Sequence, residues 1–272
     1  MSTSAIIGIS GQILTTDQYA GEPDIIIRDG VTAIDILCFK DKTSLNSVII
    51  PNSVTSLGNL CFYGCSSLTS IIIRDSVTTS NLTIGNSCFY NCTSLISIAI
   101  PDSVTKLSNF CFQNCSSLIS IAIPDSVTDL GNLSFYGCSS LISIIIPDGV
   151  TRINTSNFQN CSDLTSITIP DSVDTIKEIS FSGCTSLTYV TYNNITYKYK
   201  YFTTDNDRTN PVKILVENNN INDWDILLTL QTFTLDPSNI TVENYGTINM
   251  TFSDNITQED ILGNLTVDPS NA

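Results

Sequence analysis

The sequence predicts a solenoid, in which coils stack with a parallel β-sheet on one face and short helical turns on the other. Three observations lead to this fold class. The eleven residues SLISIAIPDSV stand at 94–104 and again at 117–127, and SLISIIIPDGV follows at 140–150. Each copy opens with the apolar spacing L-x-x-I-x-I, which is typical of a strand with one buried face. Each copy is also followed by a Phe at a nearly constant distance, as expected for stacked repeats.

The unit occurs seven times between residues 24 and about 192. Its Val residues are spaced 23, 23, 27, 23, 23 and 23, and a Phe follows each Val by eight residues, or by twelve in the third unit. The four additional residues of that unit fall around Thr79–Leu82. We expect them to bulge outward, because an insertion inside a stacked wall would break its pairing. The two series are Val31, Val54, Val77, Val104, Val127, Val150, Val173 and Phe39, Phe62, Phe89, Phe112, Phe135, Phe158, Phe181.

Within a unit, the Leu and both Ile of the strand are predicted to point inward, while the Ser and the middle residue point outward. Pro-Asp ends the strand, because proline fixes one φ angle and removes an N–H donor. Two residues after the Phe, six units carry Gly or Asn, which tolerate the left-handed conformation that closes a short helical turn. A single coil cannot bury its own apolar side, but stacked coils cover one another. The six closing residues are Gly64, Asn91, Asn114, Gly137, Asn160 and Gly183.

The phrases LTSITIPDSV (164–173), SLISIAIPDSV and CFQNCSSL (111–118) resemble the BspA-like class of leucine-rich repeats over about residues 24–192. The resemblance implies a leucine-rich-repeat solenoid, and proteins that act at surfaces in adhesion or partner binding. The sequence departs from the usual Ala before the Phe. Because Cys is also small, we expect the fold to tolerate the change. The residues at this position are Cys38, Cys61, Cys88, Cys111, Ser134, Asn157 and Ser180.

The ends of the repeat divide the chain into three parts. Residues 1–23 are predicted to be an N-terminal lead-in, 24–202 the solenoid with its cap, and 203–272 a β-rich C-terminal segment. TYVTY-NN-ITYKYKYF (188–202) indicates a β-hairpin cap. NDWDILLTL (222–230) indicates a short helix, and TINMTFS (247–253) a strand. The stretch TINMTFSDNITQEDILGNLTVDPS weakly resembles bacterial immunoglobulin-like surface modules, which implies a truncated module of that kind.

Charge and composition exclude several functional classes. The net charge is −15, with 11 Lys plus Arg against 26 Asp plus Glu, so nucleic acid and anionic membranes are unsuitable partners. The N-terminal residues contain no basic n-region, and no apolar run approaches 18 residues, so neither a signal peptide nor a membrane span is predicted. Synthesis in the cytoplasm with display on a cell or virion surface is compatible with this. The chain has no histidine, and we expect no catalytic residue, cofactor or metal.

The ten cysteines allow three interpretations. Metal sites usually use CxxC spacing or His ligands, and neither is present. Disulfides between stacked coils would distort a regular ladder. We favour the third interpretation, in which the cysteines are small buried packing groups, while disulfides and metal or redox chemistry stay open. Four of them precede the Phe, and the other six stand three residues after it: Cys65, Cys92, Cys115, Cys138, Cys161 and Cys184.

A row of aspartates is predicted beside the ends of the strands. Turn chemistry accounts for Pro-Asp-Ser without any ion. Calcium binding stays open as an alternative, although carboxylates in single file do not surround an ion with six to eight oxygens. A carboxylate pair for glycoside hydrolysis is weaker still, because no aspartate differs from the next. The row is Asp29, Asp75, Asp102, Asp125, Asp148 and Asp171, interrupted by Asn52.

The outward strand face is the candidate partner-binding surface, because soluble proteins seldom leave a contiguous apolar stripe uncovered. Repeat drift without any ligand is the alternative, and Tyr63, Tyr90 and Tyr136 form a second, smaller aromatic patch. We predict a non-enzymatic interaction or adhesion protein whose solenoid face binds a protein or glycan. A structural component of a virion or cell-surface layer, with self-association, is the alternative. The candidate residues are Ser70, Ile72, Ser97, Ala99, Ser120, Ala122, Ser143, Ile145, Ser166 and Thr168.

Overall fold

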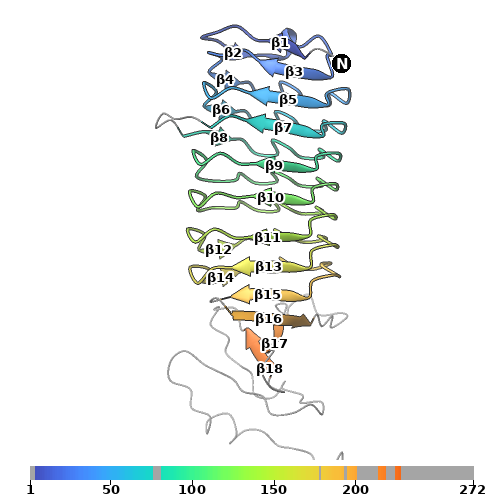
Figure 1. Cartoon of the computed structure of the whole chain (residues 1–272), viewed down its shortest axis with the longest axis vertical. Coiled ribbons are helices and arrows are strands. Elements are labelled where there is room, and N and C mark those ends of the chain that lie inside the picture. Colours follow the sequence, from blue (N-terminus) through green and yellow to red (C-terminus); the bar gives the residue numbers. More distant parts are fainter. Residues whose placement is uncertain are drawn as a thin grey trace, which may run out of the picture.

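The structure is a computed structural model that describes residues 4–75, 81–177, 179–192, 195–200, 214–218 and 224–227, with side chains up to Thr191. Eight coils stack into one elongated column, with the N-terminal coil at one end (Figure 1). We number the coils from this end, so that coil 1 contains Tyr19 and coils 2 to 8 contain, in order, Phe39, Phe62, Phe89, Phe112, Phe135, Phe158 and Phe181. The predicted solenoid with a parallel sheet is therefore confirmed.

The first wall of the column is a row of parallel strands, one for each coil and a ninth that follows the last coil. Neighbouring strands pair at the same repeat position, so that Ala99 lies opposite Ala122. Between the sixth and seventh strands the row continues through a hydrogen bond from Ile142 N to Ile119 O of 3.1 Å. The strands are β1 (Ala5–Ile7), β3 (Asp24–Ile27), β5 (Ser47–Ile50), β7 (Ser70–Ile73), β9 (Ser97–Ala99), β10 (Ser120–Ala122), β11 (Ser143–Ile145), β13 (Ser166–Ile169) and β15 (Tyr189–Tyr192).

Strand alternation places the predicted residues inside. In the fifth coil Leu95, Ile98 and Ile100 are buried, whereas Ser97 and Ala99 are exposed. The same pattern recurs along the row because the side-chain period of a strand is two and the coils are in register. The inward apolar residues from all coils form one continuous cluster.

A second wall consists of two-residue strands that follow the turn at Pro-Asp-Ser-Val. In that turn the Val N–H donates to the Pro carbonyl, as for Val127 and Pro124 at 3.0 Å. Lys106 and Asp129 form a parallel bridge in the coils that lack a named strand here. The short strands are β2 (Ile13–Leu14), β4 (Ala33–Ile34), β6 (Ser56–Leu57), β8 (Thr83–Ile84), β12 (Arg152–Ile153) and β14 (Thr175–Ile176).

The third wall, which we call the reversal wall, is the segment around each Phe, and the short helices predicted there are wrong. Among the described residues the only helical segment is η1, a 3-10 turn at Thr16–Gln18. The left-handed residue predicted two positions after the Phe is confirmed, for example at Asn114 (φ 59°). A second one occurs two positions before the Phe, as at Phe110 (φ 59°), and two left-handed residues in five interrupt a helix. The earlier residues are Leu37, Leu60, Ser87, Phe110, Leu133, Ser156 and Ile179.

These left-handed residues direct alternate N–H groups toward the next coil. The N–H groups between them instead close turns within their own coil, as Gln113 N donates to Phe110 O at 3.3 Å. The reversal wall therefore has its own hydrogen-bond ladder, opposite the sheet, and both walls tie each coil to its neighbour. In the fifth coil the three bonds are Phe110 N to Asn132 O at 2.8 Å, Phe112 N to Ser134 O at 2.8 Å and Asn114 N to Tyr136 O at 2.7 Å.

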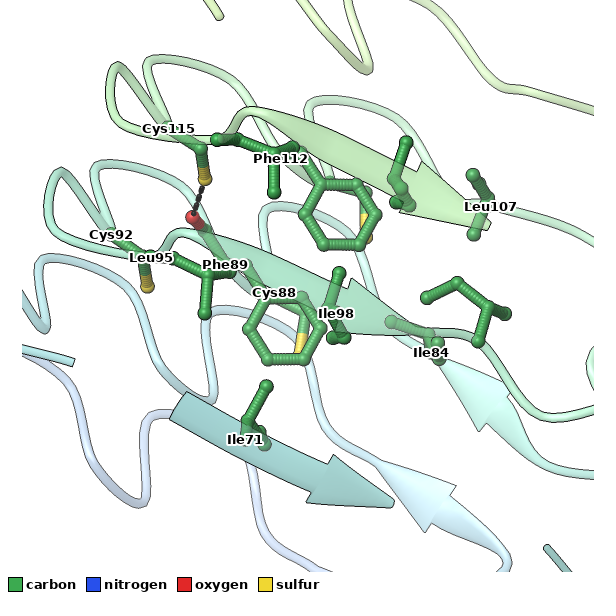
Figure 2. Packing of buried hydrophobic residues seen from close by; sticks show 14 of the residues in the cluster. Ile71, Ile84, Cys88, Phe89, Cys92, Leu95, Ile98, Leu107, Phe112 and Cys115 are labelled. Carbon is green, nitrogen blue, oxygen red and sulfur yellow. Dashed lines mark hydrogen bonds between the residues drawn. The ribbon is translucent and has the colours of Figure 1, made fainter. Parts of the chain in front are cut away.

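The Phe side chains form a column through the core. Adjacent rings from Phe39 to Phe181 have centroids 5.0 to 5.7 Å apart and are nearly parallel, with interplanar angles of 3–8°. Figure 2 shows Phe89 and Phe112 packed above Ile71 and beside Ile98. Each ring covers the ring of the preceding coil, so the uniform 23-residue spacing produces one uninterrupted apolar core.

Residues 4–23, predicted as a lead-in, form the first coil instead. β1 pairs in parallel with β3, and β2 pairs with β4. Tyr19 takes the place of the Phe and packs edge-on against Phe39, at 5.4 Å and 78°. This coil has only 20 residues and carries Gly11 where the next coil has Val31, which is why the repeat pattern does not reveal it.

At the other end, the predicted hairpin is confirmed. β15 pairs antiparallel with β16 (Ile195–Lys200), and β17 (Ile214–Asn218) and β18 (Trp224–Leu227) extend the sheet. The helix predicted at 222–230 is wrong where the chain is described, because Trp224–Leu227 is a strand paired with β17. The predicted strand at 247–253 and the immunoglobulin-like resemblance lie outside the described residues, as do Thr79 and Ser80 of the predicted bulge. Leu82, the last residue of that bulge, is buried rather than turned outward.

Candidate binding surface

The cysteines belong to the reversal wall. All ten are buried and unpaired. Cys115 Sγ donates a hydrogen bond to the carbonyl of Phe89 in the preceding coil, at 3.1 Å (Figure 2). The same bond, at 3.0–3.2 Å, is made by the other five cysteines that follow a Phe: Cys65, Cys92, Cys138, Cys161 and Cys184. Each thiol thus adds a bond between adjacent coils to a carbonyl that already accepts a turn N–H, as Phe89 O does from Cys92 N at 3.2 Å.

Burial makes these thiols poor nucleophiles. It raises the pKa of Cys65 and of Cys184 to about 12, and it raises the pKa of Cys92, Cys115 and Cys138 well above the ordinary value of 9.0. The thiolate is the reactive form, so at neutral pH these groups remain protonated. Their arrangement suits packing between coils.

The aspartate row lies on the exposed turns after the strands. Asp102, Asp125, Asp148 and Asp171 are exposed, and each follows a Pro whose carbonyl accepts the turn hydrogen bond. The Ser of the same turn also acts structurally, since Ser126 Oγ donates to Val104 O of the preceding coil at 2.7 Å. No group of three or more potential metal ligands lies close together among the residues that the structure describes.

The outer face of the sheet bears the predicted partner-binding residues, and most of them are exposed. Ile72 and Ile145 are 52% and 70% exposed, and Ser97, Ala99 and their equivalents in the sixth coil are exposed between them. Ser166 and Thr168 are half-buried. The structure therefore brings these side chains together as one row of serines and one mainly apolar row across successive strands.

A second apolar row was not singled out from the sequence. Ile96, Ile119 and Ile142 each directly follow the buried Leu of their coil, and 48%, 43% and 48% of these side chains are exposed. A bond from Ile119 N to Ile96 O of 2.9 Å holds the first two in register. The signal was present in the sequence, because the coils to either side carry Asn46, Thr69 and Thr165 at this position. We call the two rows over coils 4 to 7 the apolar patch, comprising Ile72, Ile96, Ala99, Ile119, Ala122, Ile142 and Ile145.

Next to the row of Ile96, Ile119 and Ile142, the equivalent positions of other coils are polar and hydrogen-bonded. In the first coils Ser47 Oγ and Asn46 Nδ2 donate to one carboxylate oxygen of Asp24 at 2.6 and 3.0 Å, which lowers the pKa of that carboxyl. Thr69 Oγ1 donates to Asn46 Oδ1 at 3.0 Å. Beyond the patch, Thr165 Oγ1 donates to Ile142 O at 3.0 Å. The row of Ile96, Ile119 and Ile142 is thus bounded by polar residues. The row of Ile72 instead continues toward the N-terminal coil through the half-buried Ile49 and Ile26 to Ile6, which is 60% exposed.

The tyrosine patch predicted on the reversal wall is smaller. Tyr63 and Tyr90 stack at 4.8 Å and 11°, and Lys40 Nζ lies 5.5 Å from the Tyr63 ring centroid. Tyr136 is two coils beyond Tyr90, and its hydroxyl accepts a hydrogen bond from Asn160 Nδ2 at 3.2 Å. The faces of the stacked rings are partly occupied by neighbouring side chains, so this patch offers less free apolar surface than the sheet.

Comparisons with known proteins agree with this geometry. A family model described as BspA type leucine-rich repeat region matches residues 22–82 and 82–207, in six copies. A leucine-rich repeat protein of T. pallidum is 25% identical, with a TM-score of 0.56 over 66% of this chain and 86% of its own. A leucine-rich repeat protein of Bacteroides ovatus is 32% identical, with a TM-score of 0.53 over 62% of this chain and 46% of its own. A search among curated proteins finds no significant match.

The fold and its repeated strands define a leucine-rich repeat protein. The chain belongs to the BspA-type leucine-rich repeat family, whose pattern covers most of the solenoid. The resemblance inferred from the repeat phrases is confirmed. Among the residues that the structure describes, no helical segment has the length and hydropathy of a membrane span.

Proposed function

We propose that this chain is a non-enzymatic interaction protein whose outer sheet face binds a protein or glycan partner. One observation carries the proposal: five isoleucines with 43–70% exposure gather on one face of a rigid sheet. Exposed apolar patches of this kind usually mark an interaction site. Family membership supports the same class of function, because leucine-rich repeat proteins are typically interaction or surface proteins.

The rigidity of the scaffold also supports binding. Hydrogen-bond ladders on the sheet wall and on the reversal wall fix each coil to the next. A preorganised surface loses little conformational entropy when a partner docks. The strands therefore present the patch in one geometry, which favours a specific contact.

Repetition argues against catalysis. An active site needs one location whose chemistry differs from its surroundings. In the described part of the chain the thiols, turn aspartates and strand serines recur from coil to coil with the same neighbours. The apolar patch is the feature that varies along the column, and it offers contact area without a nucleophile or an acid–base pair.

The test uses three proteins on purified-protein and glycan arrays. The first is the parent chain, and the second is the face variant Ile72→Ser/Ile119→Ser/Ile145→Ser. The third is a control with the exposed reversal-wall residues changed, Leu37→Ser/Tyr63→Ser/Phe110→Ser. All six side chains are at least partly exposed, so both variants are expected to fold, which circular dichroism checks.

We expect a ligand that the parent and the control bind with similar affinity. The face variant should bind it at least about tenfold more weakly, because it lacks a set of anchor residues. A ligand lost by the control and kept by the face variant would place binding on the wrong wall and overturn the proposal. Ordered assembly of the parent without any array ligand would instead favour the structural role and also overturn it.

A further inference from the structure

The charge around the apolar patch identifies the chemistry of its partner. Between residues 75 and 151 the chain carries five aspartates and a single cation, Lys106. Asp102, Asp125 and Asp148 stand on exposed turns at the end of β9, β10 and β11, the strands that carry both apolar rows. At the end of β7, which carries Ile72, the exposed Arg74 stands beside Asp75, whereas the Pro-Asp turns after β9, β10 and β11 contain no cation.

This arrangement disfavours a second copy of the chain as the occupant. Two copies meeting face to face would each bring a net charge of −15 and the same acidic border. Like charges brought together across an interface oppose association. A partner with cations at its rim would meet the aspartates favourably and would gain in association rate as well as specificity.

We propose that the occupant of the patch is a basic protein segment that places a large apolar side chain between Ile72 and Ile145 and lysine or arginine against the turns of Asp102 and Asp125. This inference rests on the proposed function and names its partner class. Between those two isoleucines the outward row carries Ala99 and Ala122, whose short side chains let a partner side chain approach the strands. Burying one such anchor in a patch rimmed by polar groups is typical of interface hot spots.

The probes are three fluorescein-labelled peptides of equal length. The first alternates lysine with serine around a central tryptophan. The second has alanine in place of the tryptophan, and the third has glutamate in place of every lysine. Fluorescence anisotropy at low and at moderate salt compares them on the full chain. We expect the first peptide to bind, the second to bind at least about tenfold more weakly, and the third to show no binding.

Two pairs of variants place the contact on the patch. Ala99→Ile/Ala122→Ile fills the row with isoleucine, the residue that coils 4 and 7 already have at this position, so the variant is expected to fold. Its affinity for the first peptide should be at least about tenfold lower than that of the parent chain. Thr168→Ile, one coil beyond the patch, should not. Asp102→Asn/Asp125→Asn should weaken binding more than Asp17→Asn/Asp35→Asn, which removes the same charge from exposed positions in the first two coils.

The possible failures separate this inference from the proposed function. Equal binding of the lysine and glutamate peptides, or no binding of the first, overturns the basic-partner inference. Equal losses for the two aspartate pairs, or an unaffected Ala99→Ile/Ala122→Ile variant, also overturn it. The proposed function still stands in each case if the arrays yield a ligand, a glycan included, that only the face variant loses.

Discussion

The reversal wall and the outer face of the sheet wall show opposite kinds of regularity. On the reversal wall every coil from the second to the eighth places a Phe in the stacked column between two left-handed residues. On the outer sheet face, successive coils carry Ile72, Ala99, Ala122, Ile145 and Thr168 at one position. The reversal wall is uniform because its buried side chains must stack from coil to coil. The outer sheet face varies because its side chains are exposed to solvent.

The difference shows which part of the repeat makes the fold and which part is free for recognition. A change at a buried position of the reversal wall alters a ring stack, a thiol bond or the packing between coils. A change on the outer face alters only what a partner meets.

The largest effect is expected from high pH. In the unfolded chain a thiol ionises near its ordinary pKa of 9.0, whereas burial keeps the pKa of Cys38, Cys65 and Cys184 at about 12. A raised folded-state pKa means that stability is fully present below pH 9 and falls as pH rises toward 12. Between pH 9 and pH 12, each such thiol lowers the free energy of unfolding by about 1.4 kcal/mol per pH unit. Because nine thiols have a raised pKa, the total loss at pH 10 is on the order of 10 kcal/mol.

We therefore expect cooperative unfolding between about pH 9 and pH 11, because the loss is comparable with the 5–15 kcal/mol stability of a typical domain. Circular dichroism follows the unfolding, and absorbance near 240 nm follows the thiolates in the same titration. In Cys138→Ser, the plot of unfolding free energy against pH should be less steep by the contribution of one thiol, about 1.4 kcal/mol per pH unit. Thiolates that appear near pH 9 while the protein stays folded would contradict the role assigned to the reversal wall.

A smaller effect, of opposite sign, is expected at Asn157. This side chain is fully buried at the position before the Phe, and neither of its amide atoms has a hydrogen-bond partner. The first five units carry Cys or Ser there. We expect Asn157→Cys to raise the unfolding free energy by about 1–3 kcal/mol, because it removes a desolvated amide.

The matched control is Ser134→Cys in the neighbouring coil. Ser134 Oγ donates to the Ser108 carbonyl at 3.2 Å, so its replacement removes a satisfied hydrogen bond and should not stabilise the protein. Urea unfolding of both variants measures the two differences. A loss of stability in Asn157→Cys, or an equal gain in Ser134→Cys, would contradict this account of the position.

Much of the fold could be predicted from the sequence because stacking imposes one spacing on every coil. The strand positions, the inward Leu and Ile, and the left-handed Gly or Asn after the Phe all leave a repeated residue type. The second left-handed position does not, since it holds residues as different as Leu60, Ser87 and Phe110. Its conformation is set by the hydrogen bond to the next coil rather than by the residue itself. For that reason the sequence indicated a helix where the structure has consecutive turns.

The candidate surface was predicted in part. Ile72 and Ile145 follow from strand alternation, because they occupy the outward position between two inward isoleucines. Ile96 does not, since it directly follows the buried Leu95 at the entry to the strand, before the alternation of β9 begins. Strand alternation therefore does not indicate that residues 96 and 97 are both exposed, and only the polar residues at the equivalent position of other coils, such as Thr69, indicate it.

We expect the reversal wall to stabilise the fold and the apolar patch to contribute little to stability. The most direct test measures the unfolding free energy of Ile145→Ser beside that of Phe112→Ala. We expect a loss below about 1 kcal/mol for Ile145→Ser, whose side chain is 70% exposed. We expect a loss of about 3–5 kcal/mol for Phe112→Ala, which opens the aromatic column. Comparable losses in the two variants would contradict the claim, because the outer face would then be part of the folding core.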